Sequence, residues 1–253
     1  MATKLEFASY LSYQHFAESV RTRWRFGSDP EQSAFLQALL ATSVPRQEVI
    51  PRGSNLWRAQ VGHDWYPSCD EPGEEQPAPF GVERMKPLRG RAREGRANPK
   101  GIPYLYVATD QDTAVAEVRP WVGSYVSAAQ FALKRDIRVV NCTTDGHGLN
   151  LYCQEPAPEE RERAVWRDLD RGFSQPVTPS DDTADYVPTQ IIAECFRSNG
   201  LDGLAYRSSL GQGHNVALFD LDAASVIGCG LFEILGVKFD SAMAANPYSV
   251  STE

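Results

Sequence analysis

Four polar side chains lie in apolar or glycine-rich surroundings, where they could carry chemistry. Arg58 lies in the strand-like segment LWRAQ, and Glu117 lies in the alanine- and valine-rich segment TAVAE. A buried guanidinium or carboxylate is costly unless it meets an opposite charge, a hydrogen-bond partner or a ligand. Tyr106 precedes Glu117 in the strand-like LYVAT, and Ser208 opens the turn SSLGQGH. Two interpretations stay open: a structural ion pair of Glu117 with Arg119 or Arg58, and a ligand pocket.

Three other kinds of site find less support. The 4 histidines are scattered, and none lies at metal-ligand spacing from another ligand-type residue. Ser208, Ser209 and His214 share one turn, but the nucleophile-elbow pattern G-x-S-x-G is absent. With Gly211 and Gly213 the same turn could offer N–H groups to a phosphate, yet it lacks the known phosphate-loop patterns. A hairpin turn is the simpler interpretation, and no metal is expected.

The elements that must position these residues are a mixture of helices and strands. Helices are predicted over 3–26, 28–41, 158–173 and 189–199, and a capped helix carries Glu117. Strands are predicted over 55–61, 124–133, 137–142, 203–207, 215–219 and 226–239, and around Tyr106. The helix over 158–173 is predicted to be solvated, and 62–101 and 174–185 are predicted loops. Because strand and helix do not alternate regularly, the fold class is α+β rather than a doubly wound sheet.

The chain is expected to divide into three parts. Residues 1–50 form a helical N-terminal extension, 51–240 the main domain and 241–253 a loose tail. The loop predicted over 62–101 contains the acidic run DEPGEE and, within 84–100, a basic run of Arg and Lys with the single acid Glu94. A solvated loop is one interpretation of the basic run. A positive field for a phosphorylated small molecule is the other.

The composition argues against several classes of protein. A formal net charge of −8 disfavours a general nucleic-acid binder, because phosphate contacts need a basic face. The N-terminus lacks an apolar signal core, and the most apolar region falls short of the ~18 apolar residues of a membrane span. The 5 cysteines have no regular spacing, which indicates reduced thiols. We therefore expect a soluble, cytoplasmic protein that binds neither nucleic acid nor membrane.

Taken in order along the chain, these segments resemble the RES domain, the toxin half of RES–Xre toxin–antitoxin pairs. The resemblance covers about 55–219. Its matching residues are Arg58 in LWRAQ, Arg96 in GRAN, Tyr106 in LYVAT, Glu117 in TAVAE, Ser208 in DGLAYRS and Asn215 in NVALF. The segment YVPTQIIAE resembles the helix before the final motif. Ala97 and Arg207 depart from the family pattern, which prefers an aromatic residue and a proline there.

The resemblance implies a fold and an activity. The fold would be a compact ADP-ribosyltransferase-like split β-sandwich with peripheral helices. The protein would consume NAD⁺ as its substrate, without a separate cofactor, with phosphate or water as the acceptor. Two alternatives are an ADP-ribosyltransferase that modifies a protein and a non-catalytic binding module. An Xre-like antitoxin is an expected partner, and the N-terminal helices would serve homo-oligomerisation, antitoxin contact or packing alone.

The resemblance also implies roles for the matching residues. Glu117 would stabilise the positive charge that develops on the ribose as the bond to nicotinamide breaks. Tyr106 would stack against nicotinamide, and Arg58 would hold pyrophosphate oxygens or a ribose hydroxyl. Ser208 would hydrogen-bond the nicotinamide-ribose side, or Ser209 would after a shift of one residue. The remaining substrate-binding residues would be Arg96 and Asn215.

Overall fold

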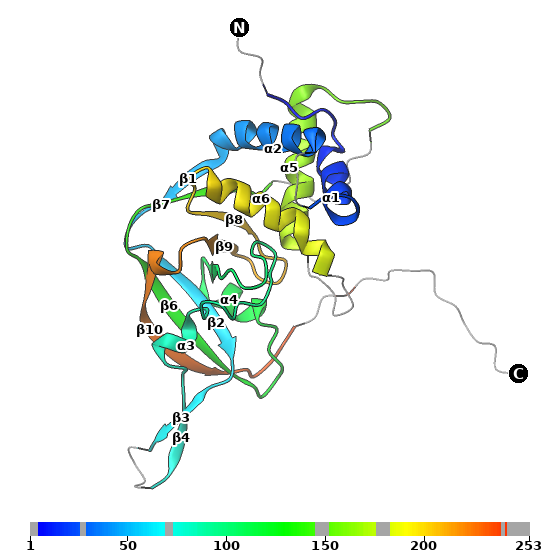
Figure 1. Cartoon of the computed structure of the whole chain (residues 1–253). Helices are drawn as coiled ribbons and strands as arrows, with labels where there is room; N and C mark the ends of the chain where they lie inside the picture. Colours follow the sequence, from blue (N-terminus) through cyan, green and yellow to red (C-terminus); the bar gives the residue numbers. More distant parts are fainter. Residues whose placement is uncertain are drawn as a thin grey trace, which may run out of the picture.

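A mixed sheet with helices gathered at one end organises the chain (Figure 1). The computed structural model describes residues 5–25, 29–68, 73–144, 152–175, 183–238 and 241. The strands of this sheet are β1 (Gln47–Ile50), β2 (Asn55–Val61), β5 (Leu105–Ala108), β6 (Tyr125–Leu133), β7 (Ile137–Asn141), β8 (Gly203–Arg207), β9 (His214–Leu218) and β10 (Ala224–Glu233). Across the sheet they run β1-β7-β8-β9-β5-β2-β6-β10, and only β7 and β8 pair in parallel among these described strands.

The sheet parts between β2 and β5. These two strands share a single register pair, Trp57 opposite Ala108, whereas β2 pairs with β6 along its whole length. The two halves pack against each other, since one buried cluster joins Leu56 and Phe131 of the β2-β6-β10 half with Leu218 of the other half. This arrangement confirms the predicted α+β fold and its split β-sandwich.

Four helices pack together, and the last two of them contact β8 of the sheet. They are α1 (Ser12–Thr22), α2 (Pro30–Ser43), α5 (Pro158–Ser174) and α6 (Val187–Ser198), and their buried side chains form one cluster with Leu204 of β8. The prediction of a solvated helix over 158–173 is wrong for one face of α5, which buries Trp166, Leu169 and Phe173. Numerous charges mask this apolar stripe, which recurs at helical spacing.

The long loop predicted over 62–101 contains regular structure. Strands β3 (Asp64–Pro67) and β4 (Glu75–Ala78) form an antiparallel hairpin that projects from the body (Figure 1). A short helix, α3 (Val82–Met85), follows and buries Met85. The hairpin leaves Trp65 and Tyr66 exposed, so its sequence lacks the alternation that marks a half-buried strand. The acidic run lies partly outside the described residues.

The structure also bears on the predictions for the two ends of the chain. Helix α1 begins only at Ser12, because the preceding residues form a turn in which the N–H of Ser9 donates to the Ser12 hydroxyl. Helix α2 has Asp29 as its N-cap and a proline at its first position, as predicted. Apart from residue 241, the predicted loose tail lies outside the described residues. Among the described helices, none is long and apolar enough to cross a membrane.

Candidate active site

Glu117 is the last residue of α4 (Gln111–Glu117), a short helix that follows β5. Its Oε1 accepts hydrogen bonds from the Ser208 hydroxyl at 2.7 Å and from the Asn215 side-chain amide at 2.6 Å. Both donors are almost fully buried, at 4% and 6% exposure. Oε2 accepts no hydrogen bond from the residues that the structure describes. The carboxylate is therefore held through one oxygen while the other stays available.

The turn that carries Ser208 is locked to the start of α4. The Ser208 hydroxyl accepts from the N–H groups of Leu210 and Gly211, which closes the hairpin turn between β8 and β9. The N–H of Gly213 donates to the Thr113 hydroxyl at 2.9 Å. A Cβ at Gly211 would lie 2.6 Å from that same hydroxyl oxygen, so a side chain there would collide with α4. The close approach of turn and helix therefore depends on glycine.

The two serines of the doublet differ in burial and in their contacts. Ser208 contacts Glu117, whereas Ser209 is exposed and makes no hydrogen bond to Glu117 in the described part of the chain. The glycine turn is bonded to α4 rather than open as an N–H cradle, which is the hairpin interpretation of the LGQG sequence.

Arg58 lies at the place where β2 and β5 part. Its Nη1 donates to the Tyr106 carbonyl on β5 at 3.0 Å, while its Nε is sealed from solvent and has no hydrogen-bond partner among the described residues. No carboxylate of the described residues lies within ion-pair distance, and burial lowers the pKa of the guanidinium. The ion pair between Arg58 and Glu117 that the sequence left open is absent there. An anionic ligand would compensate for this buried charge.

Tyr106 holds the GRAN segment with its hydroxyl. That hydroxyl donates to Asn98 Oδ1 at 2.8 Å and accepts from the N–H of Ala97 at 3.0 Å, and burial raises the pKa of the phenol. Gln190 of α6 supports the same segment by donating to the carbonyls of Gly95 and Asn98. The hydroxyl of Tyr106 is thus committed to the protein, and its ring is what remains for a ligand.

Arg96 extends from this segment toward α5. Its Nη1 donates to the Phe173 carbonyl near the end of that helix. Ala97, the departure from the family pattern, is fully buried in the helix-covered core. The missing aromatic ring is therefore replaced by packing around a small residue rather than by open space.

A cavity of about 310 Å³ brings most of the predicted residues together. Its lining includes Arg58, Arg96, Tyr106, Glu117 and Asn215. Ser208 stands behind Glu117 and Ser209 lies away from the lining. The sequence did not single out three aromatic residues that also line the cavity, namely Trp57, Tyr186 and Tyr206. Trp57 adjoins Arg58, and the other two lie in segments of the RES resemblance, so these positions were signals that could have identified them.

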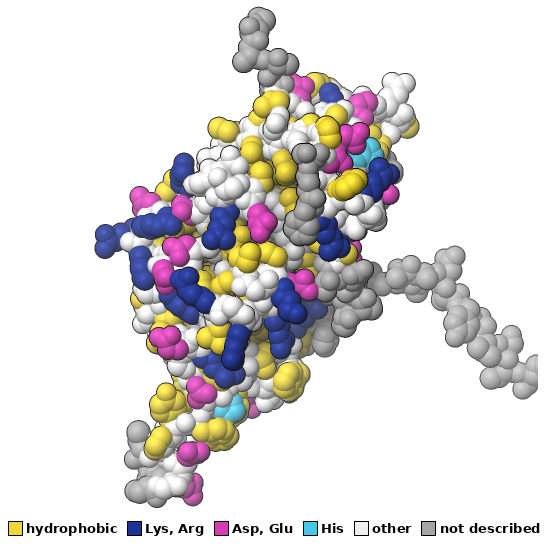
Figure 2. Space-filling model, in the orientation of Figure 1, with side chains coloured by type: hydrophobic (Ala, Val, Ile, Leu, Met, Phe, Trp, Pro, Cys, Tyr) yellow, Lys and Arg dark blue, Asp and Glu magenta, His cyan; other side chains and the backbone are white. Residues whose placement is uncertain are grey.

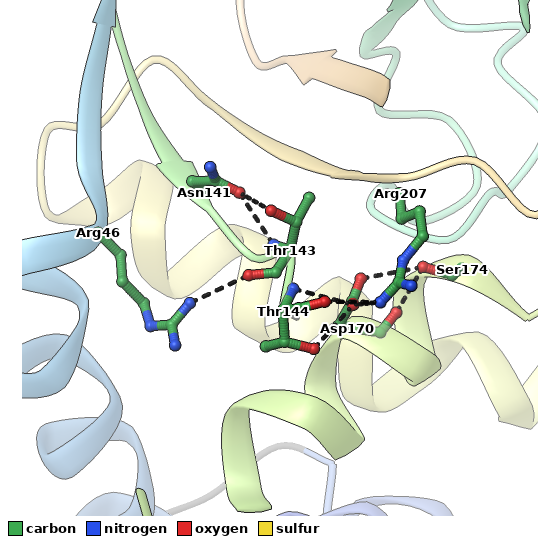
Figure 3. Close-up of polar contacts among 7 residues, drawn as sticks. All are labelled: Arg46, Asn141, Thr143, Thr144, Asp170, Ser174 and Arg207. Atoms are coloured by element: carbon green, nitrogen blue, oxygen red, sulfur yellow. Dashed lines mark hydrogen bonds and ion pairs between the residues drawn. The ribbon is translucent and has the colours of Figure 1, made fainter. Parts of the chain in front are cut away.

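A second polar cluster surrounds Arg207, the residue before Ser208 (Figure 3). Arg207 Nη2 donates to Asp170 Oδ2 at 2.6 Å and to the Thr144 carbonyl at 2.9 Å. Asp170, which is 2% exposed, also accepts from the N–H and hydroxyl of Thr144 and from the Ser174 hydroxyl. Arg207 thus replaces the proline of the family pattern with an ion pair that ties the end of β8 to α5.

A comparison with models of protein families identifies the family of this chain. A family model described as the RES domain matches residues 55–229. The chain belongs to the RES domain family. The match contains every element that supplies the cavity residues named above. Helices α1 and α2 precede it, although they share the buried cluster of α5 and α6.

One solved structure resembles this RES protein, and a search of curated proteins finds no match. It is the crystal structure of the M. tuberculosis MbcT–MbcA toxin–antitoxin complex, with 13% identity and a TM-score of 0.42. The alignment covers 77% of this chain and 92% of that one.

Among the described residues no group of three or more His, Cys, Asp or Glu side chains could hold a metal ion.

Proposed function

We propose that this RES protein is a toxin that breaks the ribose–nicotinamide bond of NAD⁺, with phosphate or water as the acceptor. One observation carries the proposal. A carboxylate fixed through a single oxygen and a buried guanidinium without an acidic partner among the described residues line the same cavity. The family membership supports it.

The carboxylate suits a reaction that builds positive charge on a sugar. Breaking the bond to nicotinamide passes through an oxocarbenium-like transition state, in which the ribose carries positive charge. The available Oε2 of Glu117 would face that charge or orient a ribose hydroxyl, while Ser208 and Asn215 keep the carboxylate in place. Because the orientation is set before the substrate arrives, little reorganisation is needed during the reaction. Nicotinamide leaves as a neutral base.

The remaining cavity residues suit the other parts of the dinucleotide. Arg58 would hold a pyrophosphate oxygen, because its guanidinium lines the cavity and has no acidic partner among the described residues. Arg96 would add a second cation near the phosphates. The ring of Tyr106 is the proposed surface for nicotinamide, and Trp57 and Tyr206 offer further aromatic surface. Asn215 would act indirectly, by holding the Glu117 carboxylate in place.

A toxin of this kind requires a partner that restrains it. We propose an Xre-like antitoxin that covers the cavity, as the family resemblance implies. Expression of the chain alone should arrest bacterial growth, and Glu117→Gln should relieve the arrest. A Glu117→Gln variant that accumulates normally and remains as toxic as the parent would contradict the assignment of this residue.

Nicotinamide release from NAD⁺ by the purified protein tests the chemistry. We expect release by the parent and a loss of about 10²–10³-fold in Glu117→Gln, because that variant keeps an oxygen for Ser208 and Asn215 but loses the negative charge. The matched control is Asp112→Asn, an exposed acid on the same helix, which should retain the parent rate. Dependence on added phosphate would identify phosphorolysis.

The other outcomes separate the alternatives. Labelled ADP-ribose that stays attached to protein would identify a protein-directed transferase. Neither release nor attachment, with the parent and Asp112→Asn both folded, would overturn the catalytic proposal and leave a binding module.

A further inference from the structure

A second cavity adjoins the candidate active site at Arg58. It has a volume of about 690 Å³ and shares Arg58 with the candidate active site, but Glu117 does not line it. Its walls come from β2, from α3 and from the segment after α3. A ligand that extends past Arg58 away from Glu117 would therefore enter this cavity.

Half of the residues that line the second cavity are cations. Arg84, Lys86, Arg91 and Arg93 line it together with one acid, Glu83. Figure 2 shows basic side chains gathered on this face of the molecule, around α3 and α4. These residues belong to the basic run whose purpose the sequence left open.

Three of these cations are not neutralised within the described residues. Lys86 donates to the Leu221 carbonyl and lies 3.8 Å from Asp222, so it is partly committed. No carboxylate in the described ranges lies within 4.0 Å of a nitrogen of Arg84, Arg91 or Arg93. Arg84 packs over the Phe80 ring, which places it without cancelling its charge. Unpaired cations around a concave surface raise the local concentration of anions.

We propose that this cavity is a second phosphate subsite, which binds a phosphate monoester through Arg91 and Arg93. The inference rests on the proposed function for its ligand. If Arg58 holds the pyrophosphate, the adenosine end of the dinucleotide enters the second cavity. Adenosine is uncharged and does not need these arginines, whereas a 2′-phosphate on its ribose does. The substrate class is then the 2′-phosphorylated dinucleotide, NADP⁺, in preference to NAD⁺. Free inorganic phosphate has the same chemistry and is the second source to be tested.

The test measures binding rather than turnover. Calorimetric titration of Glu117→Gln with NADP⁺ and with NAD⁺ compares two ligands that differ only in the 2′-phosphate. We expect NADP⁺ to bind about ten-fold more tightly at low salt, as two exposed ion pairs would provide, and the difference to shrink at high salt. Adding Arg91→Ala and Arg93→Ala should bring the two affinities to within about two-fold. The matched control, Arg89→Ala, removes an exposed arginine that pairs with Asp222 outside the cavity and should keep the difference.

Inorganic phosphate is titrated in the same variants. Phosphate binding that needs Arg91 and Arg93, with equal affinity for NADP⁺ and NAD⁺, would identify free phosphate as the occupant. The subsite would be overturned if the preference for NADP⁺ survived the double substitution, or if the affinity for phosphate survived it. It would also be overturned if the parent showed neither a preference for NADP⁺ nor phosphate binding. Arg91-dependent phosphate binding without any dinucleotide binding would instead contradict the proposed function and leave the phosphate subsite standing. If the double substitution changed the affinity for neither dinucleotide, the phosphate subsite would be contradicted and the proposed function would not.

Discussion

The contact between Asn215 and Glu117 is the sharpest test of the site geometry. The Asn215 amide donates to Glu117 Oε1 at 2.6 Å from a residue that is 6% exposed. A hydrogen bond to a charged group contributes about 1.5–3 kcal/mol. Glu117 is only partly buried, and Ser208 remains as a second donor after Asn215 is removed. We therefore expect an interaction energy at the lower end of this range, about 1.5 kcal/mol.

A double-mutant cycle in urea unfolding measures this energy. The variants are Asn215→Ala, Glu117→Ala and their combination, and the coupling is the departure of the free energies of unfolding from additivity. The matched cycle pairs Asn215→Ala with Asp112→Ala, whose exposed carboxylate lies on the same helix and should give no coupling. Coupling below about 0.3 kcal/mol between Asn215 and Glu117 would refute the geometry, because independent residues are additive within that range. The result does not depend on any substrate.

Three further predictions concern the supports of the site. Gly213→Ala would place a Cβ against Asp110 and should lower both nicotinamide release and the midpoint of thermal unfolding; unchanged values would contradict the packing. Asp170→Ala removes a buried carboxylate that accepts hydrogen bonds from Arg207, Thr144 and Ser174, and it should lower the free energy of unfolding by about 3 kcal/mol; no change in urea unfolding would be the contrary result. Desolvation acts to raise the pKa of Asp110, but hydrogen bonds from Thr113 outweigh it and hold that pKa below its usual value. Its stabilisation is therefore present at neutral pH and lost in acid, so the difference between parent and Asp110→Ala in urea should narrow from about pH 7 to about pH 3.

The sequence predicted the individual strands and helices of the site better than the contacts between them. The strand with Arg58 and the capped helix with Glu117 are short local patterns, and both are present. Glu117 meets Ser208 and Asn215 across 91 and 98 residues of chain. That meeting depends on the register of β5 on β9, which places Ala108 opposite Asn215. No local pattern encodes such a register, so only the family resemblance grouped these residues.

The sequence-based predictions were wrong for elements whose polar and apolar residues do not follow the usual pattern of burial. The stripe with Trp166 in α5 is hidden by the charges around it, and the β3–β4 hairpin has exposed aromatic residues instead of alternation. The roles of Asn98 and Gln190 were also missed. Their amides are buried and support the loop that faces the cavity, and a buried amide cannot be recognised from composition.

The parting of β2 and β5 has a consequence for how the two halves of the sheet are held together. A continuous ladder there would tie the half-sheets by a row of backbone hydrogen bonds, but one register pair and the bond from Arg58 to Tyr106 take its place. The halves are therefore held together chiefly by side-chain packing. Arg58 belongs to one half, and Glu117, whose helix α4 packs on β2 of that half, is hydrogen-bonded to the other half through Asn215 of β9. A ligand that contacts both residues links the two halves of the sheet. Its binding therefore raises the free energy of unfolding of the whole domain.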